Sequence, residues 1–251
     1  MTDGQVLDIA VKAGEILIRS GSEIYRTEDT ITRICSSYGL KCECFVLVSG
    51  IFAEVEGKDG EHHYVIRRIK SYSTDLKRIH MVNTFSRSIE KKTLDYKKAL
   101  ETLNTIDKVV SYSFIKRVSA AMLTSFVYAL LLGGNLIESV SAFFSGLVVY
   151  SLGEILQRIG FPKFFELFIQ GASAGFMGFI ASILFPGQDS YRIIIGTIIF
   201  LVPGVAITNG IKDALYGDTL SSLYRIAEAV FTAIAVGAGV GIALSASIHL
   251  K

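Results

Sequence analysis

The chain has 251 residues, a net charge of +2 and no tryptophan. The nearly balanced charge argues against a nucleic-acid partner, which needs a clustered basic surface. The charges are unevenly spread, since 35 of the 48 Asp, Glu, Lys and Arg residues lie in positions 1–117 and 13 lie in the remaining 134. The sequence therefore predicts two chemically different halves.

The N-terminal half opens with a predicted amphipathic helix. The segment MTDGQVLDIAVKAGEILIRSG lacks the unbroken apolar core of a signal peptide, because charged residues interrupt it. Its apolar residues recur at helical spacing and predict one inward face. That face comprises Val6, Ile9, Ala10, Ala13 and Leu17.

A second predicted helix, in SGSEIYRTEDTITRIC, places a carboxylate on its apolar side. At 100° per residue Glu28 falls in the middle of an apolar stripe, where a carboxylate is costly unless it is paired, hydrogen-bonded or protonated. The stripe comprises Ile24, Ile31, Cys35 and Tyr38. The opposite face, expected to be solvated, comprises Glu23, Arg26, Asp29, Thr30 and Arg33.

Two interpretations of Glu28 stay open. In the first, it pairs with a core-facing arginine of the third strand, Arg67 or Arg68, and orders the domain. In the second, it helps to form a cytoplasmic vestibule that passes polar substrate to a membrane site. The first is favoured, because buried ion pairs more often organise a fold than react. It predicts that Glu28→Gln destabilises the soluble half.

The rest of this half completes an α+β domain, expected to be cytosolic and to occupy residues 1–115. Alternation in KCECFVLVSGIFAEVEGKDGEHHYVIRRI predicts two or three short antiparallel strands, with turns at Gly50 and GKDG. Two helices follow, one in STDLKRIHMVNTFSRSIE with Ser and Thr caps and one at about 94–107. Their expected inward residues are Leu76, Ile79, Val82 and Ile89 in the first, and Ala99, Leu103 and Ile106 in the second.

No pattern in this half indicates an enzyme, a cofactor or a metal site. Cys42 and Cys44 lack the spacing and the second pair of a zinc knuckle, so packing in the core is the favoured interpretation. His62 and His63 lie in a polar turn and are expected at the surface. With Cys35, both cysteines are expected to be free thiols in a reducing compartment.

The C-terminal half contains five uncharged runs: 118–137, 139–153, 167–188, 193–211 and 229–250. Roughly 20 helical residues cross the hydrocarbon of a bilayer, and a soluble bundle would show a polar stripe that these runs lack. The predicted fold class is a multi-pass α-helical membrane protein with five transmembrane helices and an N-terminal cytosolic α+β domain. The helices are expected at about 118–134, 137–156, 164–185, 191–211 and 224–248, in a transmembrane domain of residues 116–251.

The loop charges predict the orientation. With the N-terminus in the cytoplasm, the inner connections contain Arg158, Lys163, Lys212 and Arg225, and the outer positions contain Arg192 and Lys251. This distribution satisfies the positive-inside rule. We expect a prokaryotic cell (inner) membrane, with the C-terminus outside.

The fourth run contains a predicted break. Pro203 lacks an amide proton and clashes with the preceding turn, and Gly204 follows it. A bilayer tolerates such a break where the freed backbone faces protein or a water-filled cavity, and transporters often build substrate sites there. Thr208, Asn209 and Asp213 follow, the last two on one face.

These five residues are the candidates for a substrate or proton site, together with Glu138 at the edge of a span. Asn209 is expected to bind substrate, and Asp213 is expected to hold the coupling proton or a substrate ammonium. The alternative interpretation is a simple proline kink with an interfacial Asp213.

Three stretches resemble motifs of the threonine/serine exporter (ThrE) family, which includes the shorter YjjP-like proteins. They are SGSEIYRTEDTITRI, with Glu23, Arg26, Glu28 and Arg33; LLGGNLIESVSAFFSG, with Glu138; and LVPGVAITNGIKDALYGDTLSSLYR, with Gly217, Asp218 and Arg225. The order of the motifs is similar to that of the family, and the resemblance covers nearly the whole chain. Ser221–Ser222 departs from the Ser-Gly of many members.

The resemblance implies a proton-motive-force-driven secondary exporter of small amino or carboxylic acids, threonine/serine or succinate-like, that needs no cofactor. Long members carry a second set of about five spans. A chain with one set resembles the split members, which work with a small all-membrane partner subunit. Membrane lipid, protons and the substrate are the other expected partners, and a homo-oligomer assembled through the cytosolic domains is a further expectation.

The competing hypothesis is a membrane-anchored cytosolic enzyme or ligand sensor. An anchor needs neither a broken helix nor the small-residue pairs Gly171–Gly175 and Gly237–Gly241, which indicate close helix packing. The sequence therefore favours transport.

Overall fold

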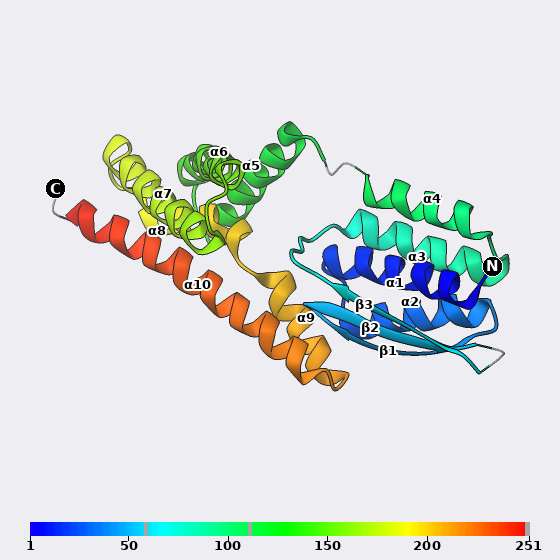
Figure 1. The fold of residues 1–251 in the computed structure, drawn as a ribbon. Helices are drawn as coiled ribbons and strands as arrows, with labels where there is room; N and C mark the ends of the chain where they lie inside the picture. The colour runs from blue at the N-terminus through cyan, green and yellow to red at the C-terminus, as the bar shows by residue number, and fades with distance from the viewer. Residues whose placement is uncertain (58–59, 110–111, 249–251) are drawn as a thin grey trace. The chain divides into compact units, whose positions relative to one another are not determined.

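The computed structural model describes residues 1–57, 60–109 and 112–248 (Figure 1). The chain divides into two compact units. The first unit comprises residues 1–111 and 205–226, and the second comprises 112–204 and 227–251. The first unit thus includes a segment from the half that was expected to lie in the membrane, whereas the boundary between a cytosolic and a membrane part at residue 115 stays a prediction.

The first unit has three layers. Its elements are α1 (Asp3–Arg19), α2 (Ile24–Ser37), β1 (Lys41–Leu47), β2 (Gly50–Glu56), β3 (His62–Arg68), α3 (Leu76–Lys91), α4 (Tyr96–Asp107), α9 (Gly204–Leu215) and the start of α10 (Thr219–Ile248). The strands form an antiparallel sheet in the order β1-β2-β3. Helices α1 and α2 pack on one face of this sheet, and α3 and α4 pack against those two helices (Figure 1).

Local sequence signals explain where these helices begin. Thr2 and Gln5 form a capping box at the start of α1. The side chain of Asp75 accepts a hydrogen bond from the amide of Arg78, so Asp75 caps α3 and the expected Ser and Thr caps are wrong. Asp95 caps α4 in the same way.

The core of the first unit confirms most of the predicted inward faces. All five predicted residues of α1 are buried, as are the three of α4. In α3, Ile79, Val82 and Ile89 are buried, but Leu76 is 71% exposed because it lies in the first turn, beyond the apolar layer. The three antiparallel strands are confirmed, although Lys58 and Asp59 of the predicted GKDG turn lie outside the described residues.

The predicted solvated face of α2 is partly wrong. Asp29 is exposed, and Arg26 and Arg33 are half-buried, but Glu23 and Thr30 are buried. The apolar stripe is confirmed at Ile24, Ile31 and Cys35. Helix α2 is thus covered on more than one side, and the covering element at Glu23 is described below.

The second unit is helical. Its elements are α5 (Phe114–Leu131), α6 (Leu136–Ile159), α7 (Lys163–Leu184), α8 (Ser190–Ile198), the 3-10 turn η1 (Ile199–Leu201) and α10 from residue 227. Four helices of the described chain are long and apolar enough to cross a membrane: α5, α6, α7 and α10. The pair α8–η1 and α9 makes a fifth candidate only if it is counted as one broken span. The sequence is thus that of a multi-pass membrane protein with four or five spans.

Glycines allow close packing inside the second unit. A Cβ atom at Gly171 would lie 2.4 Å from the carbonyl oxygen of Val236, and one at Gly175 would lie 2.8 Å from the Cβ of Ala243. The seam predicted at this pair is therefore confirmed. On α10 the close approach is made by Gly239, whereas Cβ atoms at Gly237 and Gly241 would meet no described atom within 4 Å.

Candidate functional site

The predicted break in the fourth apolar run is present. The 3-10 turn ends at Leu201, and α9 begins at Gly204, directly after Pro203. Two turns into α9, Asn209 and Asp213 lie on one face, as their spacing predicts, and both are buried. Thr208, between the break and this pair, is exposed.

Asp213 binds two groups with its two carboxylate oxygens. Oδ2 accepts a hydrogen bond from Nε of Arg225 at 2.9 Å, and Oδ1 accepts one from the backbone amide of Ile24 at 3.1 Å. Ile24 is the first residue of α2, whose own N-cap residue, Glu23, makes no side-chain capping bond. Asp213 therefore caps α2 from a distant part of the chain, where the partial positive charge of a helix N-terminus favours a carboxylate.

Arg225 and Asn209 bind the same turn through its carbonyl groups. Nη2 of Arg225 donates to the carbonyl oxygen of Ser22 at 2.7 Å, and Nδ2 of Asn209 donates to that of Gly21 at 2.9 Å. The side chain of Arg225 is 3% exposed and that of Asp213 is 0% exposed, so water does not compete for this ion pair. The turn between α1 and α2 is held at consecutive peptide groups.

A partly exposed layer surrounds this buried pair. Nζ of Lys212 lies 3.0 Å from Oε1 of Glu23, and Nη1 of Arg26 lies 3.2 Å from Oε2. The rings of Tyr25 and Tyr216 stack with their centroids 3.9 Å apart. We name the side chains of Asn209, Lys212, Asp213 and Arg225, which hold residues 21–24, the turn clamp.

Two glycines make the turn clamp possible. Gly21 has a φ of +80°, a conformation that residues with a Cβ rarely adopt, and it closes the end of α1. Gly210 lets α9 approach α10 closely, because a Cβ there would lie 3.1 Å from Ile226 and 3.3 Å from the Cβ of Arg225. The approach brings Arg225 within reach of Asp213.

The carboxylate of Glu23 pairs with Lys212 of the turn clamp and with Arg26. Burial by itself would raise the pKa of Glu23, but hydrogen bonds from its own amide and from Lys212, and the charge of Arg26, outweigh burial and hold that pKa below its ordinary value. Glu23 is therefore ionised and pairs with two cations. Three buried hydroxyl groups on the joined segments, those of Ser20, Ser22 and Ser221, have no hydrogen-bond partner among the described residues.

Glu28 has a different partner from the one expected. Its Oε1 accepts a hydrogen bond from the amide of Val46 in β1 at 3.1 Å, whereas Arg67 binds Asp8 and Glu15. The predicted ion pair with Arg67 or Arg68 is wrong, since neither arginine appears among the partners of Glu28. Burial raises the pKa of Glu28, the bond from Val46 lowers it, and the charge of Asp218 raises it further, so the pKa lies above its ordinary value.

Glu138 belongs to a separate polar cluster in the second unit. Its carboxylate accepts from the amides of Asn135 and Asp189 at 3.0 and 2.7 Å and lies 3.4 Å from Nη1 of Arg192. Asn135 and Glu138 form a capping box at the start of α6. Glu138 therefore stabilises a helix end and its adjoining loop.

Sequence reasoning missed part of the turn clamp. Arg225 was recognised only as a loop charge and a motif residue, and Lys212 only as a loop charge. A signal for both exists, because Lys212, Asp213, Asp218 and Arg225 are opposite charges on either side of a glycine turn within an otherwise apolar stretch. No side-chain pattern in the sequence indicates that these residues bind the backbone of the α1–α2 turn.

The cysteines lie where core packing was expected. Cys35, Cys42 and Cys44 are free thiols. The pKa of Cys42 is raised to about 12, first by a hydrogen bond with Cys35 and then by burial, so this thiol stays neutral and unreactive. Within residues 1–57, 60–109 and 112–248, no three His, Cys, Asp or Glu side chains are arranged to hold a metal ion.

Comparison with known proteins gives the family. The model of the threonine/serine exporter family, ThrE, matches residues 8–247, which include every residue of the turn clamp and of the turn it holds. The chain belongs to the threonine/serine exporter family. This confirms the resemblance carried by the three sequence motifs.

Two curated relatives carry the same description. The chain is 25% identical to the "Probable threonine/serine exporter" of Mycobacterium tuberculosis over 96% of its own length and 46% of the relative. It is 25% identical to the "Threonine/serine exporter" of Corynebacterium glutamicum over 98% of its own length and 52% of the relative. It therefore spans about half the length of these curated relatives. No solved structure matches it.

Proposed function

We propose that this chain is one subunit of a proton-motive-force-driven secondary exporter of small amino or carboxylic acids, threonine/serine or succinate-like, which works with a small all-membrane partner subunit. The observation that carries the proposal is the family match over residues 8–247 in a chain with four or five candidate spans. In support of a partner subunit, the chain spans 46% and 52% of the two curated relatives, and a second membrane subunit would supply the remaining part.

The proposed topology places the N-terminus in the cytoplasm of a prokaryotic cell (inner) membrane. With the broken pair of α8–η1 and α9 counted as one span, five spans place the C-terminus outside. A second set of five would then run in the opposite sense, which is the inverted-repeat arrangement in which transporters form a site between two sets of helices.

The turn clamp supplies the chemistry that an amino-acid substrate requires. Arg225 binds a carbonyl oxygen and would bind a carboxylate more strongly, and Asp213 binds an N–H group and would bind an ammonium group more strongly. Asn209 both donates and accepts hydrogen bonds. The α1–α2 turn thus presents the same pair of groups, a C=O and an N–H, that a zwitterion presents in charged form.

From this equivalence we propose that substrate or proton binding at Asp213 and Arg225 competes with the α1–α2 turn. Protonation of Asp213 would leave Arg225 without its counter-charge and weaken the hold on Ile24. Export would then alternate between a state in which the turn is held and one in which the buried pair is open to substrate. Pro203 and Gly204 would supply the backbone freedom at the start of α9.

Transport in proteoliposomes tests the proposal. The chain is reconstituted with and without its partner subunit, and efflux of labelled threonine, serine and succinate is followed with an imposed pH gradient and with the gradient collapsed. We expect efflux of at least one substrate only with both subunits and the gradient. Gradient-independent efflux would rule out proton coupling, and no efflux of any of the three with both subunits would favour a membrane-anchored enzyme or sensor.

A further inference from the structure

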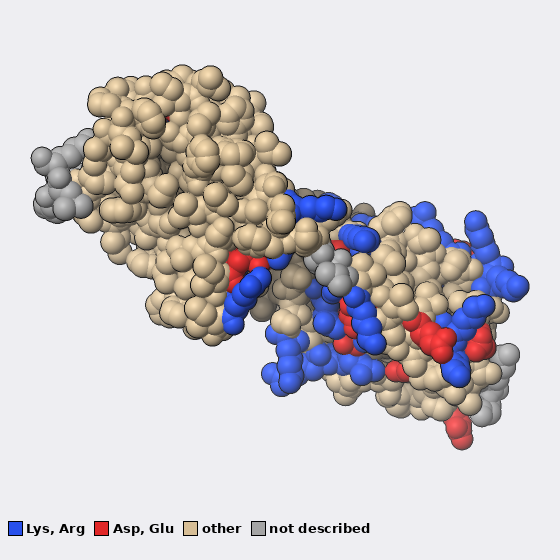
Figure 2. All heavy atoms as spheres, turned by 90° about the horizontal axis from the view of Figure 1, so that it is seen from above, with Lys and Arg blue, Asp and Glu red and all other residues tan. Residues whose placement is uncertain are grey.

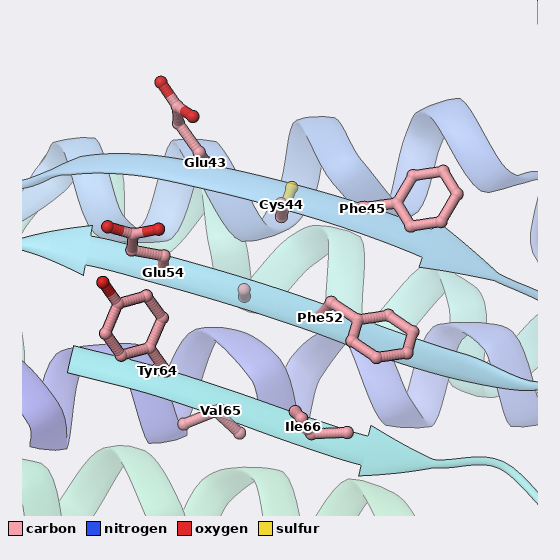
Figure 3. Close-up of a pocket in the computed structure, with 9 residues that line it drawn as sticks. Glu43, Cys44, Phe45, Phe52, Glu54, Tyr64, Val65 and Ile66 are labelled. Carbon is pink, nitrogen blue, oxygen red and sulfur yellow. The ribbon is translucent and has the colours of Figure 1, made fainter. Parts of the chain in front are cut away.

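The outer face of the three-stranded sheet is not covered by any described element of the first unit. Helices α1 and α2 lie behind the sheet, and the side chains of its other face project away from them (Figure 3). Several of these side chains are large and apolar or aromatic yet exposed, with Tyr64 at 67% and Ile66 at 73%. With Phe45 and Phe52 they line a shallow groove of about 500 Å³.

The strand register arranges this outer sheet face in rows. Phe45 lies opposite Phe52, and Phe52 lies opposite Ile66, so the three form one apolar row across the sheet (Figure 3). The rings of Phe45 and Phe52 have centroids 6.3 Å apart. Alternation along each strand places the next row on either side about 7 Å away.

The two neighbouring rows differ in charge. One row is Glu43, Glu54 and Tyr64, and the carboxylate of Glu54 lies beside the aromatic ring of Tyr64 (Figure 3). The other row contains Arg68, which is exposed and forms no ion pair within the described residues. The apolar row is therefore bordered on one side by two carboxylates, which lie near Lys41 and His62 respectively, and on the other side by a cation without an ion pair among the described residues.

This charge pattern determines the occupant. A membrane surface rich in anionic lipid requires a basic rim, which the exposed carboxylates of Glu43 and Glu56 oppose. A second copy of the chain needs no other partner, because a two-fold axis in the plane of the sheet and perpendicular to the strands lays the apolar row over itself. The same rotation keeps each residue over its own strand, so Arg68 lies over Tyr64 of the second copy, with Glu54 of that copy on the adjacent strand.

We propose that two copies of this chain pair through their outer sheet faces about that axis. Phe45, Phe52 and Ile66 form the apolar centre, and Arg68 of each copy binds the carboxylate of Glu54 on the other. Two sheets packed in this way lie about 10 Å apart, and aromatic residues are enriched at the centre of such interfaces. The exporter proposed above would then contain two copies of this chain.

Charge reversal tests the pairing without disturbing the core. The mass of the detergent-solubilised full chain is measured over a range of concentrations for Arg68→Glu, Glu54→Arg and the double variant. We expect each single change to raise the dimer dissociation constant about ten-fold or more, and the double variant to recover it. Recovery excludes misfolding as the cause. A parent chain that is monomeric at every concentration overturns the proposal, as does a double variant no better than either single one.

Cysteine placement tests the direction of the axis. Phe52 lies on the axis, so Phe52→Cys brings two thiols together, and a short bis-maleimide should cross-link the dimer. Glu56→Cys lies on the same strand and face but four residues away, so its two copies are roughly 26 Å apart and should not react. The parent chain controls for the native thiols. Cross-linking of both variants would overturn this axis in favour of one parallel to the strands.

A membrane occupant would give a different result in a third measurement. Phe52→Glu removes the apolar centre, and we expect it to abolish the dimer while the reconstituted chain stays folded. If Phe52→Glu instead leaves the oligomer unchanged and lowers hydrogen-exchange protection of the sheet only when anionic vesicles are present, the face binds lipid and the proposed dimer is wrong.

Discussion

The two polar clusters of this protein contain the same groups and connect different distances along the chain. In each, a buried carboxylate pairs with an arginine and accepts hydrogen bonds from backbone amides. Glu138 accepts hydrogen bonds from the amide of Asn135, three residues away, and from that of Asp189, 51 residues away. The side chain of its partner Arg192 is 41% exposed. Asp213 binds Ile24, 189 residues away in sequence, and its Arg225 is almost inaccessible to solvent.

This difference in burial and sequence separation indicates that Glu138 caps a helix, whereas Asp213 couples distant parts of the chain. An ion pair that solvent reaches contributes little and can lose a partner cheaply, whereas a fully buried pair becomes costly when one partner is removed. Lys212, Asp213, Asp218 and Arg225, the charged residues near the α9–α10 turn, would be easier to solvate at the edge of a span. The burial of Asp213 and Arg225 against a helix N-terminus indicates that they connect the first motif of the chain with the last. Figure 2 shows Lys, Arg, Asp and Glu concentrated over the part of the chain that holds the sheet, with few over the apolar helices.

Asp213→Asn should have the largest effect. It leaves Arg225 buried without a counter-charge, which costs about 3–5 kcal/mol when one partner of a buried pair is removed. We expect a large fall in the thermal stability of the solubilised chain and loss of pH-gradient-driven export, while substrate exchange persists at low temperature. Unfolding scans and paired efflux and exchange assays measure both.

The double variant Asp213→Asn, Arg225→Met makes this prediction specific. Removing both charges restores most of the stability, because a neutral pair needs no compensation. If export returns with stability, the pair is only structural, and the proposed distinction from Glu138 fails. Asp218→Asn, in the adjoining turn, is the matched control and should keep both stability and export.

The sequence predicted the elements better than it predicted their contacts. Periodicity located the helices of both halves, and alternation located the strands with the correct inward residues, because these signals depend on neighbours a few residues away. The break at Pro203 and the shared face of Asn209 and Asp213 follow from the same local rules. The prediction that Leu76 is buried was wrong, because the apolar periodicity of α3 continues into its first turn, which does not contact the core.

Long-range partners could not be obtained in this way. Glu23 looked like a surface residue because its cover, Lys212, is 189 residues away. An arginine was predicted as the partner of Glu28 because charged side chains can be identified in a sequence. The actual partner is the backbone amide of Val46, and a sequence does not show which backbone amide will bind a carboxylate. The turn clamp binds backbone groups, which every residue carries, so no residue type marks them.

Pro203→Ala should have the next largest effect. It restores an amide donor and allows helix to continue between Leu201 and Gly204, so that the start of α9 loses its freedom. We expect exchange and net efflux to fall together, with no loss of thermal stability. The result sharpens the comparison because α6, capped by Glu138, contains no such break. Unchanged transport would show that the break is a passive kink.

Asn209→Ala should have an intermediate effect. It removes the hydrogen bond to the carbonyl oxygen of Gly21 and leaves a buried acceptor unpaired, at a cost of about 1–3 kcal/mol. We expect a higher substrate concentration at half-maximal export with the maximal rate retained. Leu215→Ala, at a 79% exposed position of the same helix, is the control. A change in rate without a change in the half-saturating concentration would remove Asn209 from substrate binding.

Glu138→Gln should have a smaller effect and tests the other side of the comparison. The variant keeps an acceptor for only one of the two amides, because Asn135 binds Oε2 and Asp189 binds Oε1, and it also loses the charge that pairs with the half-exposed Arg192. We expect a loss of about 1–2 kcal/mol in stability and normal coupling of export to the pH gradient. If coupling is lost as in Asp213→Asn, both carboxylates carry protons, and the two clusters do not differ in function.

Glu28→Gln should have the smallest effect, and its sign is the opposite of the sequence expectation. Without an arginine partner, the ionised carboxylate is disfavoured by burial and by Asp218, so its pKa in the folded chain lies above the ordinary value of 4.5. A raised pKa means that the contribution of Glu28 to stability is fully present below pH 4.5 and is lost as the pH rises through the folded pKa. At neutral pH the neutral glutamine, which still accepts from Val46, should therefore stabilise the first unit slightly, and the gain should vanish at acidic pH. Hydrogen-exchange protection of α2 and β1 in the full chain measures this, with Glu90→Gln on the exposed side of α3 as the control. A variant less stable than the parent at pH 7 would show that an ionised Glu28 is held by a cation after all.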